Sequence, residues 1–117
     1  MITGKNYIGF QQIANGNTTY KTFNSQLNNA NEVVFTEAIS SEINQAVALA
    51  SNAFLSYKTM SGTKKATFLN AIADEILALD TELIKTYCSE TGLPEGRAKG
   101  ERGRTVGQLH MFANLVA

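Results

Sequence analysis

Hydrophobic and polar positions follow one period in the first third of the chain and another in the rest. Asn6–Gln11 contains Ile8 and Phe10 at a period of two, and Thr18–Phe23 is rich in threonine and aromatic residues, as is typical of strands. Asn15–Asn17, with its central glycine, favours a turn with positive φ. The pattern therefore predicts a hairpin of these two strands. After the polar stretch Asn24–Asn31, the run Val33–Thr36 predicts a third, short strand that pairs with one of the first two.

From Ser40 onward the apolar spacing changes to that of helices. A first helix has Ser40 or Ser41 as its cap, and Glu42 in its first turn interacts favourably with the helix dipole. Its apolar face follows the i, i+3, i+4, i+7 spacing and consists of Ile43, Ala46, Val47, Ala50, Ala53, Phe54 and Tyr57. This periodicity indicates the most regular helix of the chain.

Three further helices are predicted. Ser61 caps the second helix and Asp80 caps the third. Gly92 ends the third helix, because glycine readily adopts the left-handed conformation at a helix C-terminus. Pro94 suits the first turn of a fourth helix, which runs to the last residue.

The fourth helix ends in an apolar stripe with nothing after it that could cover it. The stripe consists of Val106, Leu109, Ala113 and Val116. Such a stripe is stable only against a partner surface. We therefore expect the 117-residue sequence to be the leading piece of a longer protein.

Four glycines lie on one face of the predicted fourth helix, since successive residues of a helix are rotated by about 100°. They are Gly96, Gly100, Gly103 and Gly107. Each costs roughly 1 kcal/mol relative to alanine in a helix interior, so another interaction must offset them. Two interpretations stay open, close packing of another helix or room for a substrate. The charged residues of the same helix exclude a membrane dimer motif.

A polar row lies beside this glycine face and contains Arg97, Glu101, Arg104 and Gln108. One interpretation is a solvated ladder of ion pairs, each worth a few tenths of a kcal/mol. The other is a partly buried arginine that binds a carboxylate through two parallel hydrogen bonds.

Composition limits the partners and the chemistry. Ten basic and ten acidic residues cancel, so no basic patch indicates nucleic acid or a membrane surface. The longest apolar runs have only a few residues, so the sequence predicts neither a signal peptide nor a membrane-spanning helix. A cytoplasmic location is therefore expected. Cys88 is the single cysteine, which excludes an internal disulfide. Neither Cys88 nor His110 has the neighbours of a catalytic or metal-binding group, and we predict structural roles for both.

Three motifs are typical of one enzyme family. Glu90–Pro94 has the form E-T-G-x-P, Phe112-Ala113 is an aromatic-alanine pair near the end of the following helix, and Gly100–Thr105 reads GERGRT. With the order of elements, these motifs resemble the N-terminal portion of the NAD(P)-dependent aldehyde dehydrogenases over essentially the whole chain. GERGRT resembles the branch that oxidises α-ketoglutaric semialdehyde (2,5-dioxovalerate). Ser25 departs from the family pattern, which usually has proline after Phe-Asn.

The resemblance implies an α/β fold of the aldehyde dehydrogenase type, of which this chain holds the first part. Residues 1–38 would form a strand region, and residues 39–117 a helical part that in the family belongs to the coenzyme-binding domain. The parent enzyme would oxidise an aldehyde, expected to be α-ketoglutaric semialdehyde, with NAD or NADP, and would be a homo-oligomer. In the family the nucleophile, the catalytic domain and the coenzyme-binding residues lie downstream, so the chain alone should be inactive.

The resemblance also implies a substrate site. In the family the matching helix lines the tunnel to the nucleophile, and its tunnel-facing positions here are Gly100, Arg104 and Gln108. Arg104 would bind the carboxylate of an acidic aldehyde while Gly100 leaves room, unless Arg104 pairs with Glu101. An alternative for the whole chain also stays open: a stand-alone α+β interaction module without catalytic activity.

Overall fold

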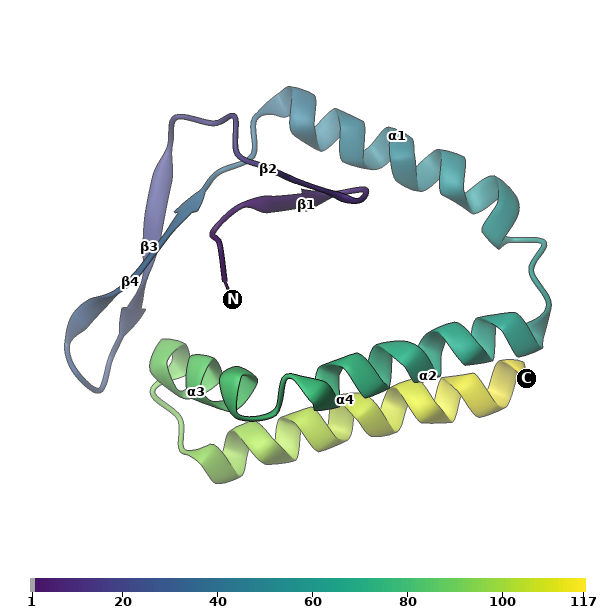
Figure 1. Cartoon of the computed structure of the whole chain (residues 1–117). Coiled ribbons are helices and arrows are strands. Elements are labelled where there is room, and N and C mark those ends of the chain that lie inside the picture. The colour runs from purple at the N-terminus through teal and green to yellow at the C-terminus, as the bar shows by residue number, and fades with distance from the viewer. Residues whose placement is uncertain (1) are drawn as a thin grey trace. The chain divides into compact units, whose positions relative to one another are not determined.

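The computed structural model describes residues 2–117, and these form two strand pairs and a set of helices (Figure 1). The α/β class predicted from the sequence is confirmed. The chain divides into two compact units, residues 1–23 with 29–59 and residues 24–28 with 60–117. Within the described part, no helix is both long and apolar enough to cross a membrane. The elements are β1 (Asn6–Ile8), β2 (Gln11–Ile13), β3 (Thr19–Asn24), β4 (Asn29–Thr36), α1 (Ser40–Tyr57), α2 (Gly62–Ala78), α3 (Asp80–Thr91) and α4 (Glu95–Val116).

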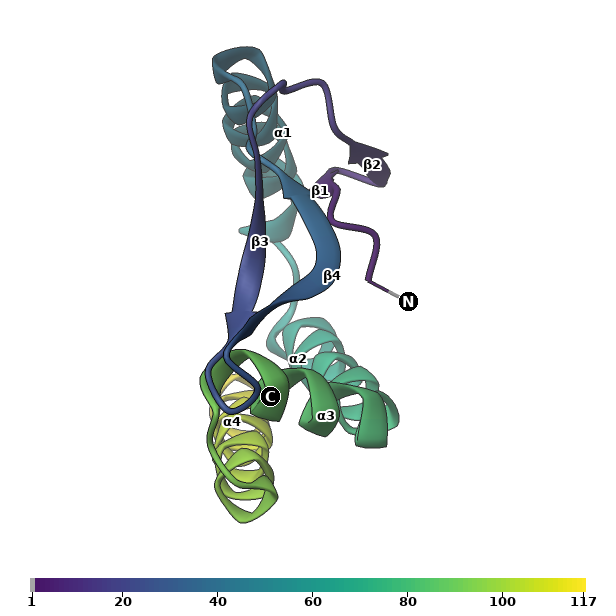
Figure 2. The same ribbon diagram turned by 90° about the vertical axis from the view of Figure 1, so that its left-hand side faces the viewer.

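The strands pair differently from the predicted hairpin. β1 pairs with β2 in antiparallel register, with Asn6 opposite Ile13, and β3 pairs with β4 (Figure 2). The prediction of one strand over Asn6–Gln11 is wrong, because Gly9 adopts a φ of 60° and turns the chain there. The predicted strand Val33–Thr36 is confirmed as part of β4, and it pairs with β3 as expected.

Asn15–Asn17 is not the turn of a hairpin. Its first residue is held at the start of α1, where the Asn15 N–H donates to Glu42 Oε1 at 3.0 Å. The second Glu42 oxygen accepts from the Ile39 N–H at 2.9 Å, and the Glu42 side chain is buried. Ile39, rather than Ser40 or Ser41, is the N-cap of α1. The predicted serine cap is wrong because the carboxylate of Glu42 satisfies the free N–H at this helix end.

α2 and α4 lie side by side in the second unit and run in opposite directions (Figure 1). A side chain at Gly62, the first residue of α2, would collide with the carbonyl oxygen of Val116 at the end of α4. The buried apolar residues of this unit are small or of medium size, which permits a close approach of the helices. They are Ala66, Ala73, Ile84, Ala98, Val106 and Ala113.

The apolar stripe of α4 is partly covered within the chain. α2 packs along α4, and Val106 and Ala113 are buried, whereas Val116 is exposed. The predicted need for a partner surface is thus met for its buried members by an earlier helix of the same chain. The sequence could not show this, because the cover comes from a helix that lies many residues earlier in the chain.

The ends of the second to fourth helices agree with the sequence except at three places. The Ser61 hydroxyl accepts from the Lys64 N–H at 3.3 Å and caps α2, as predicted. Asp80 does not cap α3, because Leu79 joins α2 directly to α3 and is its N-cap. The Asp80 carboxylate instead accepts from Arg102 of α4 at 3.4 Å. Pro94 is the N-cap of α4 rather than part of its first turn, and the helix ends one residue before the last.

Candidate functional site

The junction Glu90–Pro94 determines how α4 leaves α3. Gly92 adopts a φ of 72° and ends α3, as predicted. A side chain at this position would collide with the Ser25 hydroxyl, and the Gly92 carbonyl accepts from the Gln26 amide at 2.8 Å. The Thr91 hydroxyl donates to the Tyr87 carbonyl at 2.7 Å and accepts from the Leu93 N–H at 3.1 Å. This network fixes both the turn and the last residues of α3.

The glycine face of α4 is open in the described part of the chain. A Cβ added at Gly96, Gly100, Gly103 or Gly107 would meet no atom within 4 Å. The buried residues of α4, such as Ala98 and Ala113, lie on another face of the helix. Within residues 2–117, the glycines therefore do not serve close helix packing, and they leave room for another group.

An open groove of about 510 Å³ runs along this face. It is lined by Gly96, Arg97, Gly100, Glu101, Arg104, Thr105 and Gln108. All three residues predicted to bind substrate, Gly100, Arg104 and Gln108, belong to it. The structure thus brings them together, and their role in binding stays a prediction.

An exposed ion pair occupies one part of the groove. The Arg97 Nε donates to Glu101 Oε1 at 2.7 Å, and the two side chains are 64% and 45% exposed. The interpretation of this row as solvated ion pairs is therefore right for Arg97 and Glu101. Hydrogen bonds from Arg97 and from the Tyr87 hydroxyl hold the pKa of Glu101 below its ordinary value.

Arg104 is exposed, so the interpretation of a partly buried arginine is wrong for this side chain. Across residues 2–117, its guanidinium forms no hydrogen bond or ion pair, although its positive charge also lowers the pKa of Glu101. Glu101 has its hydrogen bond to Arg97 instead, so the alternative in which Glu101 pairs with Arg104 is not the arrangement found. A free guanidinium beside an open glycine face can bind a carboxylate in the two-pronged manner.

Tyr87 is the residue of this site that the sequence did not indicate. Its half-buried side chain comes from α3 and lines a cavity together with Glu101 of α4. Desolvation and, after it, the Glu101 carboxylate raise the pKa of Tyr87 above its ordinary value. Helical periodicity places Tyr87 on the apolar face of α3, and no local pattern shows that it shares a cavity with Glu101 of another helix.

The remaining groups that the sequence singled out lie outside the groove. Cys88 is half-buried and free. His110 Nδ1 lies 2.9 Å from the side-chain oxygen of Asn70 and links α4 to α2, in agreement with a packing role.

Comparison with known proteins gives consistent matches. The model of the aldehyde dehydrogenase family matches residues 13–117. Alpha-ketoglutaric semialdehyde dehydrogenase 2 of Azospirillum brasilense is 42% identical over 116 residues, which are 98% of this chain and 22% of that protein. The alpha-ketoglutaric semialdehyde dehydrogenase of Acinetobacter baylyi is 36% identical over 113 residues, 97% of this chain and 22% of that protein.

A solved structure is also similar in fold. Betaine aldehyde dehydrogenase of Staphylococcus aureus, crystallised in complex with NAD+, matches with a TM-score of 0.86 and 19% identity. The match covers 97% of this chain and 23% of that chain. The sequence therefore spans about a fifth of the length of the curated relatives that it matches, at 22%.

Proposed function

The chain belongs to the aldehyde dehydrogenase family, as its motifs predicted, and we propose that it is the N-terminal part of an α-ketoglutaric semialdehyde dehydrogenase. The complete enzyme oxidises this acidic aldehyde to the acid with NAD+ or NADP+. The identity of 42% to a relative of that name supports the substrate class. The alternative of a stand-alone interaction module loses support, since the family match covers residues 13–117.

The observation that carries this proposal is the free guanidinium of Arg104 beside an open groove. The substrate has a carboxylate at the end opposite its aldehyde group, and a guanidinium binds such a group through two parallel hydrogen bonds. Gly100 gives the substrate chain space, because an added Cβ there would meet no neighbouring atom in the described residues. Gln108 adds an amide to the same groove. These three residues form one wall of the substrate path.

The described residues do not form a coenzyme site. A dinucleotide pyrophosphate binds a glycine-rich turn between a strand and the start of a helix. Gly100 and Gly103 instead lie within α4, at positions where the backbone N–H groups are engaged in the helix. We therefore assign the coenzyme, together with the nucleophile, to the remainder of the parent enzyme, and the chain alone should be inactive. For the complete enzyme we expect a homo-oligomer and a cytoplasmic location.

The substitution Arg104→Leu in the full-length enzyme tests this proposal. We expect the KM for α-ketoglutaric semialdehyde to rise about tenfold or more, since charged hydrogen bonds of roughly 1.5–3 kcal/mol are lost. The KM for a neutral aldehyde of similar length should change little, because it has no carboxylate to bind. Steady-state kinetics with both substrates measure the difference.

Lys99 provides a matched control on the same helix. It pairs with Glu95 at 3.1 Å and does not line the groove, so Lys99→Leu should leave both KM values unchanged. Equal increases for the acidic and the neutral aldehyde in Arg104→Leu would exclude a carboxylate-binding role. A full-length enzyme without activity on α-ketoglutaric semialdehyde would refute the proposed function itself.

A further inference from the structure

The guanidinium of Arg104 and the amide of Gln108 line the groove and form no hydrogen bond within residues 2–117. The two other charged side chains of the groove are already engaged, since Arg97 Nε donates to Glu101 Oε1 at 2.7 Å. Within the described residues, the groove therefore offers both a free cation and a free neutral amide to a ligand.

These two side chains lie one turn apart on the same surface of α4. Gln108 follows Arg104 by four residues, a spacing that brings Cβ atoms within about 5–6 Å of each other. Thr105 also lines the groove, but it is the immediate neighbour of Arg104, and adjacent residues of a helix do not face each other. Beside the pair, an added Cβ at Gly100 would meet no atom within 4 Å in the described residues. Arg104 and Gln108 can thus contact the same end of one ligand.

The acidic end of α-ketoglutaric semialdehyde has two kinds of hydrogen-bond acceptor. A guanidinium that binds the carboxylate through two parallel hydrogen bonds uses both carboxylate oxygens. The ketone oxygen on the adjacent carbon is then left without a donor. Arg104 by itself therefore does not distinguish a 2-oxo acid from a simple acid of the same length. A glutamine amide can supply the missing donor, because its NH2 group has two N–H bonds and the ketone has no charge.

We propose that Gln108 is a specificity-determining residue, whose amide donates a hydrogen bond to the 2-oxo group of the substrate while Arg104 binds the adjacent carboxylate. This inference rests on the proposed function of the groove. An analogue without the ketone binds less well, because the amide then gives up water without gaining a partner. The groove thus selects 2-oxo acids among the aldehydes that carry a carboxylate.

The substitution Gln108→Met in the full-length enzyme tests the inference, because methionine is similar in length and has no N–H donor. The two substrates compared are α-ketoglutaric semialdehyde and 5-oxovalerate, which has the same chain length and charge but a methylene group in place of the ketone. We expect the parent enzyme to prefer the 2-oxo substrate in kcat/KM. In Gln108→Met this preference should fall about fivefold, a ratio that corresponds to one net hydrogen bond. The melting temperature should not change, since Gln108 is exposed and both residue types favour helices.

A second variant separates the hydrogen bond from the general polarity of the groove. Gln108→Glu keeps a polar side chain of the same length, but its ionised carboxylate has no donor. It should lose the preference for the 2-oxo substrate as Gln108→Met does, and its charge should weaken the binding of both acids. A preference that persists in either variant, or a parent enzyme that does not distinguish the two acids, would overturn the inference.

The variant Arg104→Leu distinguishes the inference from the proposed function. It should raise the KM of both acids and not that of a neutral aldehyde, whereas Lys99→Leu, outside the groove, should leave the preference for the 2-oxo substrate unchanged. If Arg104→Leu is selective in this way and Gln108→Met has no effect, the inference about Gln108 fails and the proposed function stands. If Arg104→Leu is not selective, the groove does not bind a carboxylate, and the roles of both residues are refuted.

Discussion

Two glutamates of the chain show how neighbouring donors decide what a carboxylate does. Glu42 is 2% exposed, and both its oxygens accept backbone N–H groups, so it connects the loop before β3 to the start of α1. Glu101 is 45% exposed and accepts from the side chain of Arg97. The first carboxylate stabilises a helix end, whereas the second determines which arginine remains free in the groove.

The pKa of Glu101 provides a test at this scale. Arg97→Leu should raise it toward the ordinary value of 4.5, because the hydrogen bond from Arg97 is the largest cause of its depression. A depressed pKa means that the interaction stabilises the folded state above pH 4.5, and that this stabilisation is lost as the pH falls through the lowered value. An NMR titration of the Glu101 carboxyl carbon in both proteins measures the shift, and identical curves would contradict the prediction.

Two glycines have opposite effects on the helices, one at a helix end and one inside a helix. Gly92 is required where it stands, since its φ is 72° and the Ser25 hydroxyl occupies the space of a side chain. Gly103 has an ordinary helical conformation and open space around it in the described residues. Gly92 forms the turn from which α4 starts. Gly103 lowers the stability of α4 and leaves the surface of that helix without a side chain at this position.

The substitution Gly92→Ala in the full-length enzyme should therefore lower the stability of the protein by about 1–2 kcal/mol from the left-handed backbone alone, with a further loss from the collision with Ser25. Gly103→Ala should raise stability by up to about 1 kcal/mol. Thermal unfolding of the two variants beside the parent enzyme measures both effects. A drop in melting temperature for Gly103→Ala as large as for Gly92→Ala would mean that the glycine face is tightly packed in the complete enzyme.

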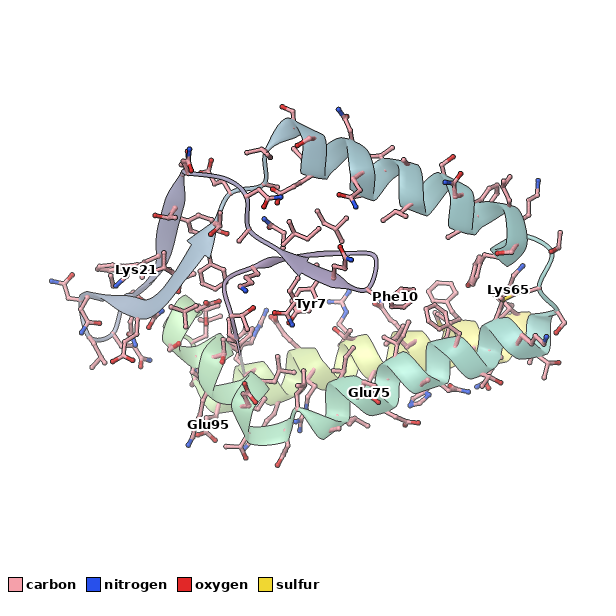
Figure 3. All side chains as sticks on the ribbon, turned by 45° about the horizontal axis from the view of Figure 1, so that its top comes forward. Tyr7, Phe10, Lys21, Lys65, Glu75 and Glu95 are labelled. Carbon is pink, nitrogen blue, oxygen red and sulfur yellow. The ribbon has the colours of Figure 1, made fainter. Side chains whose placement is uncertain are left out.

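The whole chain leaves much apolar surface uncovered. On α1 the side chains of Ile43, Val47, Phe54 and Leu55 are 53%, 64%, 57% and 61% exposed. Phe10 is fully exposed at the end of the β1–β2 hairpin, where Figure 3 labels it. Large apolar side chains exposed in this way are typical of a segment that packs against further protein.

We expect the 117-residue chain, produced alone, to self-associate and to bind a hydrophobic dye, whereas the full-length enzyme does neither to a comparable extent. Size-exclusion chromatography with light scattering, together with dye fluorescence, measures both properties. The double substitution of Val47→Glu and Phe54→Glu, which places charges on the exposed face of α1, should reduce the self-association of the isolated chain. A monomeric chain that melts cooperatively would instead favour a stand-alone interaction module.

The sequence by itself determined the features that depend on residues close together in the chain. Apolar spacing located the helices, Ser61 and Gly92 marked helix ends, and the spacing of Arg97, Glu101, Arg104 and Gln108 placed these four on one surface. Local backbone preferences and helix geometry suffice for each of these. The motifs at Glu90–Pro94 and Gly100–Thr105 also indicated the family.

Only the tertiary structure decided which strands pair, how α1 begins and which arginine Glu101 binds. Both Gly9 and Asn15–Asn17 could have formed the hairpin turn, and the structure has the turn at Gly9. The start of α1 is capped by the buried Glu42. Glu101 binds Arg97 at 2.7 Å and not Arg104, although the spacing within α4 permits both pairs. In each case several local arrangements are close in energy, and contacts between different elements select one of them.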